Sequence, residues 1–120
     1  MQIHEKIEDG IATITPKDSL LYEPDTTKLR EKIYSLVGDE VKYVVLDLGE
    51  VTYINSLGLG ALISLLTTLR RADGDLRLAR VGEKVENLFI ITRLSQIFEI
   101  YETVEQGVAS YKKTMIEKSS

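Results

Sequence analysis

The sequence predicts a single α/β domain, built as a mixed, mainly parallel β-sheet with flanking α-helices. The chain has 120 residues, of which 43% are hydrophobic and 28% charged, a length and composition that suit one globular domain. Strand-like and helix-like segments follow one another in the order ββαβαβαβα. Strands that alternate with helices after an initial hairpin are typical of parallel strands joined by helical crossovers.

The amino-terminal elements are predicted to be a β-hairpin and a helix. Two β-rich runs, 2–7 and 11–15, are separated by Glu8-Asp9-Gly10. Asp-Gly at this position favours a tight turn, because glycine accepts the positive φ that such a turn requires. After a loop, Asp25 can cap a helix that stops at Gly38. The apolar face of this helix consists of Leu29, Ile33, Leu36 and Val37.

The middle of the chain is predicted to supply the central strand. Residues 43–48, Tyr-Val-Val-Leu-Asp-Leu, form a nearly continuous apolar run, which suits a strand covered on both faces. A helix is expected from about Ser56 to Arg71. Strand, helix and strand are then expected at 76–81, 82–93 and 97–101.

The last helix is expected to open with a capping box. Thr103 and Gln106 have the spacing at which each side chain bonds the other's exposed amide. We assign the domain to residues 1–116 and expect a disordered tail over 117–120. The apolar face of the last helix consists of Val104, Val108, Tyr111 and Met115.

Composition argues against several classes of function. The chain has no cysteine, so a disulfide framework and a thiolate zinc site are excluded. The net charge is −4, and Arg70-Arg71 and Lys112-Lys113 are isolated basic pairs, so no nucleic-acid partner is expected. The longest apolar stretch, 57–69, falls short of the ~20 residues that span a bilayer, and no signal peptide is visible. We expect a cytoplasmic protein without direct membrane insertion.

The residues also give little support for catalysis, and no cofactor or metal is expected. His4 is the only histidine and has no nucleophile or carboxylate at a telling spacing. Asp47 ends a buried strand, where it could serve as a catalytic acid or simply bond to turn amides. Gly58 and Gly60 do not indicate a nucleotide loop, because Ile63 stands where a third glycine would be needed. We therefore predict that the protein is not an enzyme.

The turn Asn55-Ser56-Leu57-Gly58 is the strongest candidate for a functional site. Asn55 and Ser56 are both good N-cap residues, with side-chain oxygens that can accept amides of the first helical turn. A phosphate on Ser56 would meet unpaired amides and the positive end of the helix dipole. Gly58 and Gly60 are costly inside a helix, so close approach of a partner, or close packing against the sheet, is expected to compensate. Ser56 could instead be only a structural N-cap.

The helix that begins at this turn carries more apolar surface than one core face needs. Leu57, Ala61 and Leu65 fall outside the predicted core stripe, which indicates a contact site for a partner or for a second copy of the chain. Tyr22 and Tyr53 flank this site, where they could anchor a partner or pack half-buried. The core stripe is predicted to consist of Leu59, Leu62, Ile63, Leu66 and Leu69.

The segment from Val45 to Leu62 resembles the signature of STAS domains, the fold of bacterial anti-sigma factor antagonists and of sulfate-transporter tails. The family pattern is an apolar strand ending in Asp-Leu, a spacer with Val, and Asp-Ser-x-Gly-Leu before an apolar helix. The stretch 85–101 is similar to the family's closing helix and strand. This chain matches the signature at Asp47-Leu48, Val51, Ser56, Gly58-Leu59 and Leu62.

The resemblance implies a phosphorylation switch. Ser56 occupies the position that is phosphorylated by the partner, an anti-sigma factor that is itself a serine kinase. The unphosphorylated form binds this kinase and frees the sigma factor, phosphorylation breaks the complex, and a serine phosphatase would restore it. The partner-binding residues are then expected to be Tyr22, Tyr53, Asn55, Ser56, Leu57, Gly58, Gly60 and Ala61.

Two departures from the family pattern bear on the partner. Asn55 stands where aspartate is common, which keeps the capping geometry but removes a charge. Ser19-Leu20-Leu21-Tyr22 replaces a Gly-Glu-Leu-Asp-like loop that contacts the kinase in many members. The alternative function is a non-switching STAS subunit of a transporter or of another assembly. The apolar helix start could also serve a weak homodimer.

Overall fold

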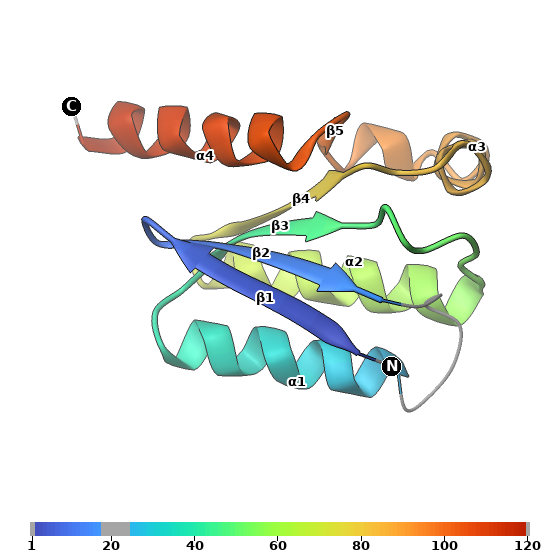
Figure 1. Ribbon diagram of the computed structural model, residues 1–120, viewed down its shortest axis with the longest axis horizontal. Helices are drawn as coiled ribbons and strands as arrows, with labels where there is room; N and C mark the ends of the chain where they lie inside the picture. The colour runs from blue at the N-terminus through green and yellow to red at the C-terminus, as the bar shows by residue number, and fades with distance from the viewer. Residues whose placement is uncertain (1, 18–24, 120) are drawn as a thin grey trace.

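The computed structural model describes residues 2–17 and 25–119 of the chain, and Figure 1 shows their arrangement. Their order confirms the predicted succession of strands and helices. The elements are β1 (Ile3–Glu8), β2 (Ile11–Pro16), α1 (Asp25–Gly38), β3 (Tyr43–Asp47), α2 (Ser56–Arg71), β4 (Asp75–Ala79), α3 (Glu83–Ile91), the 3-10 turn η1 (Leu94–Gln96), β5 (Ile100–Tyr101) and α4 (Val104–Ser119).

The five strands form one sheet in the order β1-β2-β3-β4-β5. β1 and β2 are antiparallel and the other neighbours are parallel, so the prediction of a mixed, mainly parallel sheet is confirmed. Glu8 pairs with Ile11, which leaves Asp9 and Gly10 as the hairpin turn. Both have positive φ, 56° and 78°, as a type I′ turn requires, which explains why Asp-Gly stands here.

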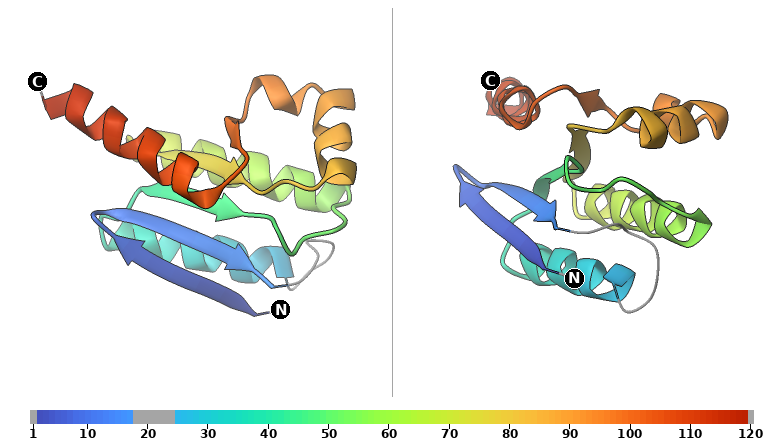
Figure 2. Two further views of the ribbon diagram at one scale, coloured as in Figure 1. Left: turned by 45° about the horizontal axis from the view of Figure 1, so that its top comes forward. Right: turned by 45° about the vertical axis from the view of Figure 1, so that its right-hand side comes forward.

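Helices cover both faces of the sheet. α1 and α2 lie against one face, and α4 lies along the other (Figure 1 and Figure 2). Side chains alternate accordingly along β3, since Val44 and Leu46 join the core with α1 and α2, while Val45 is buried with Tyr111 of α4. Val85 of α3 joins the first core, so α3 closes the carboxyl end of the parallel strands.

A buried arginine fastens α4 to the sheet. Arg77 of β4 is only 8% exposed, and its guanidinium carbon lies 4.1 Å from the centre of the Tyr111 ring. Its terminal nitrogens donate to Ser110 Oγ at 2.7 Å and to Thr114 Oγ1 at 3.3 Å, both on α4. Tyr111 donates its hydroxyl proton to the backbone carbonyl of Val44 at 2.7 Å. Polar contacts therefore hold α4 in place together with apolar packing.

The segment after α3 departs from the sequence prediction. A strand is predicted over 97–101, but the structure forms η1 first and confines β5 to Ile100–Tyr101. Phe98 accounts for the difference, because its buried ring stacks on Phe89 with centres 5.8 Å apart. The backbone at Phe98 follows the core and reaches the edge of β4 only two residues later.

The two ends of α4 also differ from expectation. Thr103 Oγ1 accepts from the Gln106 amide at 3.1 Å as predicted, but Gln106 Oε1 accepts from the amide of Glu102 instead of that of Thr103. The helix continues into the tail that the sequence predicts, as far as residue 119. In this last turn, Lys118 Nζ donates to Tyr43 Oη of β3 at 3.3 Å.

Candidate functional site

The loop between β3 and α2 carries the candidate site, and Asp47 fixes the start of this loop. The residue is 5% exposed, and its Oδ1 accepts from the amide of Gly49 at 2.9 Å. Its Oδ2 accepts from Arg80 Nη1 at 3.2 Å and from Thr15 Oγ1 at 3.5 Å. The interpretation of Asp47 as a strand-end residue bonded to a turn amide is confirmed.

Asn55, and not Ser56, caps α2. The Asn55 backbone is extended, with φ −98° and ψ −176°, and its Oδ1 accepts from the amide of Gly58 at 2.9 Å. Ser56 is the first helical residue, and its exposed hydroxyl makes no hydrogen bond with any residue the structure describes. The alternative that Ser56 is only an N-cap is therefore wrong. Asn55 supplies the cap, and the Ser56 hydroxyl stays exposed to solvent.

The buried face of α2 differs from the predicted stripe. Gly58, Ala61 and Leu65 are buried, while Ile63 is 40% exposed. α2 packs against α1 as well as against the sheet, and Leu65 shares a core with Leu29 and Ile33 of α1, so the buried arc is wider than the predicted stripe. The expectation that Gly58 and Ala61 contact a partner is corrected, because neither presents a surface. Gly58 is buried at the start of α2, and its amide donates to Asn55 Oδ1 at 2.9 Å.

An uncharged surface remains along α2. We call it the α2 strip, made of Ser56, Leu57, Gly60, Ile63 and Thr67, all of them exposed. Leu57 is 44% exposed, as the sequence predicts. No atom of another described segment lies within 4 Å of the place where Gly60 would carry a Cβ, so packing among these residues does not explain this glycine. The strip offers bare backbone and apolar side chains beside a free hydroxyl.

The two tyrosines expected beside the site have different outcomes. Tyr53 is 58% exposed, so the alternative of a half-buried packing residue is wrong. Tyr22 and the rest of the segment 19–22 lie outside the described residues.

A groove opens next to Ser56, and sequence reasoning missed it. It measures about 610 Å³ and lies between the start of α2 and α3, where it is mainly apolar. Lys84 and Leu88 reach it from α3, 28 and 32 positions further along the chain than Ser56. No local pattern could place them there, and only the position of α3 at the carboxyl end of the sheet does so. We call this feature the α2–α3 groove, lined by Thr52, Tyr53, Ile54, Asn55, Ser56, Leu59, Lys84, Val85, Leu88 and Thr92.

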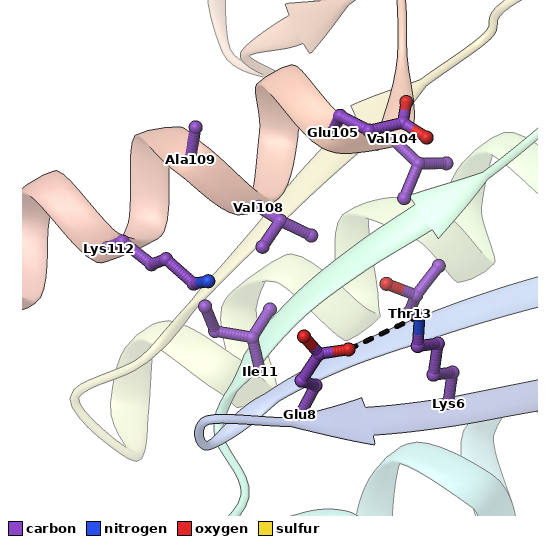
Figure 3. A pocket seen from close by; sticks show the side chains of 9 residues that line it. All are labelled: Lys6, Glu8, Ile11, Thr13, Val104, Glu105, Val108, Ala109 and Lys112. Atoms are coloured by element: carbon purple, nitrogen blue, oxygen red, sulfur yellow. Dashed lines mark ion pairs between the residues drawn. The ribbon is translucent and has the colours of Figure 1, made fainter.

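A second groove, of about 320 Å³, lies between the β1–β2 hairpin and α4 (Figure 3). It opens on the sheet face opposite α2 and is therefore separate from the Ser56 site. Its cations have partners, since Lys6 Nζ lies 3.2 Å from Glu8 Oε2 and Lys112 Nζ lies 3.3 Å from Asp9 Oδ2. Within residues 2–17 and 25–119, no cluster of three or more His, Cys, Asp or Glu is placed to hold a metal ion. Across these same ranges, no helix has the length and apolar character needed to cross a membrane.

The family model of the STAS domain matches residues 2–107. The chain belongs to the STAS domain family. This STAS domain is 33% identical to the anti-sigma-B factor antagonist of Bacillus subtilis over 82 residues, which cover 67% of this chain and 72% of that protein. The predicted membership of the STAS family is thus confirmed, and anti-sigma factor antagonists are among its relatives, as the resemblance implies.

Solved structures share the fold of this STAS domain. The NMR structure of the Thermotoga maritima protein TM1081 has a TM-score of 0.81 at 23% identity and covers 91% of this chain and 87% of that one. Unphosphorylated SpoIIAA, an anti-sigma factor antagonist, has a TM-score of 0.71 at 12% identity, with 93% and 98% coverage. SpoIIAA is also known in a phosphorylated form with the same fold, at a TM-score of 0.72.

Proposed function

We propose that this STAS domain is an anti-sigma factor antagonist controlled by phosphorylation of Ser56. Its unphosphorylated form binds an anti-sigma factor that is also a serine kinase, and addition of phosphate to Ser56 releases the complex. A serine phosphatase returns the protein to its binding form. The observation that carries the proposal is the Ser56 hydroxyl, which is exposed, free of hydrogen bonds to described residues, and placed beside an uncharged surface.

The local structure suits a switch that changes the surface and spares the fold. A phosphoserine carries about −1.5 to −2 charges at neutral pH. At the first position of α2 this charge meets the positive end of the helix dipole, which favours it. Asn55 continues to cap the helix, because its bond to the Gly58 amide does not involve Ser56. Phosphorylation therefore converts a neutral, apolar contact surface into an anionic one on an unchanged scaffold.

The experiment combines mass spectrometry with binding. Peptide mass spectrometry of the chain purified from its native cells is expected to find phosphate on Ser56 under some growth conditions. Ser56→Ala, used as bait, is expected to capture a serine-kinase anti-sigma factor, whereas Ser56→Asp is expected to lose it. Ser35→Asp on α1 places the same charge on another exposed serine and is the matched control.

Two results together would contradict the switch. These are the absence of phosphate on Ser56 under all growth conditions and equal binding of partners by Ser56→Asp and the unmodified protein. Co-purification with a transporter, with no kinase among the partners, would support the non-switching subunit instead.

A further inference from the structure

Among the described residues that line the α2–α3 groove, Lys84 is the one that carries a charge. No ion pair or hydrogen bond joins it to another described residue, in contrast to the paired cations around the second groove. Neither neighbouring acid of α3 lines the groove or pairs with Lys84. Glu86 lines a separate hollow with Tyr101, and Glu83 lines an adjoining hollow that Lys84 also borders. The groove thus combines mostly apolar walls with a single uncompensated positive charge.

The walls of the groove are suited to an apolar side chain. Leu59 and Val85 are buried at its base, Leu88 is half-buried, and Tyr53 projects 58% exposed beside them. Ser56 belongs to the lining as well as to the α2 strip, so the two surfaces are continuous. A protein that contacts the α2 strip therefore meets the groove in the same footprint. Aromatic anchors next to apolar pockets are characteristic of the residues that dominate binding energy at interfaces.

We propose that the α2–α3 groove receives an apolar segment of the anti-sigma factor that carries a carboxylate, and that this carboxylate pairs with Lys84. The inference rests on the proposed function and names the chemistry of its partner surface. Charge complementarity selects the occupant, because an acidic group is the one that an exposed, unpaired lysine beside apolar walls favours.

The pairing also accounts for release by phosphorylation. A phosphate on Ser56 enters the same groove as the partner carboxylate and carries the same sign of charge. It competes for Lys84 and repels the carboxylate at once, whereas the apolar contacts stay unchanged. The effect of phosphorylation is then local and needs no rearrangement of helices.

The test is calorimetric titration with the anti-sigma factor that Ser56→Ala captures and mass spectrometry identifies. Lys84→Glu is expected to weaken binding by about tenfold or more, because like charges then face each other at the rim. Lys113→Glu, on exposed α4 across the sheet, makes the same change of net charge and is expected to stay within about twofold. Exchange of one partner carboxylate for lysine is expected to restore binding to Lys84→Glu. An acid is tolerated at the start of a helix, so Lys84→Glu should fold, which circular dichroism checks.

Equal affinity of Lys84→Glu and the unmodified chain would overturn the inference, as would equal losses for Lys84→Glu and Lys113→Glu. In both cases the results for Ser56 would stand, so the failure would be distinct from failure of the proposed function. If Ser56→Ala captures no anti-sigma factor, both the proposed function and this inference are contradicted. Light scattering tests whether a second copy of this chain occupies the groove instead. If the unmodified chain forms a dimer that Lys84→Glu dissociates, the groove belongs to a second copy and the inference is overturned.

Discussion

Replacement of Asn55 by alanine tests which residue starts α2. The substitution removes the acceptor that the Gly58 amide bonds at 2.9 Å and leaves this amide without its side-chain partner. Loss of an Asn cap costs about 0.5–2 kcal/mol, and about 1 kcal/mol is expected here because Asn55 is half-buried and its bond has good length. For a chain of this size, that loss lowers the Tm by roughly 3–5 °C.

Two matched variants make the measurement specific. Asn55→Asp keeps the accepting oxygen and adds a negative charge at the helix start, so stability is expected to stay level or rise by about 0.3–1 kcal/mol. Ser56→Ala removes a hydroxyl that bonds no described residue, so a change within about 0.5 kcal/mol is expected. Urea denaturation of the three variants at equal slope gives the free energies of unfolding directly.

The order of stabilities decides the outcome. Asn55→Asp and Ser56→Ala should both be more stable than Asn55→Ala. A Ser56→Ala variant as unstable as Asn55→Ala would show that the serine contributes to the cap. Ser56 would then be partly a structural residue, and the argument for a free hydroxyl would fail.

Four further predictions concern Tyr111, Glu50 and Gly60. Tyr111→Phe is expected to cost about 1–2 kcal/mol in urea denaturation, because the Val44 carbonyl loses its donor. Burial raises the pKa of the Tyr111 hydroxyl, so this group keeps its proton to higher pH in the folded state than in the unfolded state. The free energy of unfolding should therefore fall as the pH rises above about 10. Tyr111→Phe should lose this contribution to the pH dependence. The bond from Lys17, at 2.6 Å, lowers the pKa of Glu50, and NMR titration of Lys17→Gln should find that pKa higher, whereas an unchanged value would refute the pairing. Gly60→Ala is expected to raise stability by up to about 1 kcal/mol, since the new methyl meets open space; a loss in thermal unfolding would contradict this.

Much of the fold could be predicted from the sequence because its local signals agree with the tertiary structure. Asp9-Gly10 favours a two-residue turn because both residues accept a positive φ. The apolar run over 43–48 favours a strand covered on both faces. The start of α2 was also predictable, since Asn55 and Ser56 both suit a cap. Which of the two caps could not be decided, because each side chain can reach the same amides.

The remaining features depend on contacts between distant segments. A helical wheel cannot tell that α1 lies beside α2, where Leu65 joins the core that it shares with α1, or that Ile63 is exposed. The sequence around Phe98 is typical of a strand, but the stacking of its ring on Phe89, which is distant in the predicted pattern, holds its backbone outside the sheet. Lys84 has no visible relation to Ser56 in the sequence, and the two line one groove only because α3 folds over the carboxyl end of the sheet.

Arg77 attaches α4 to the face of the sheet that lies opposite α2, so the contacts of α4 do not involve the residues around Ser56. These contacts use the sheet face away from Ser56, so the outward surface of α4 lies apart from the proposed switch. If α2 binds the partner as proposed, substitutions on the outward surface of α4 are expected to leave that recognition unaltered. The same property is useful at the bench, because a fluorophore attached at exposed Lys113 would sense the slower tumbling of a complex without obstructing its formation.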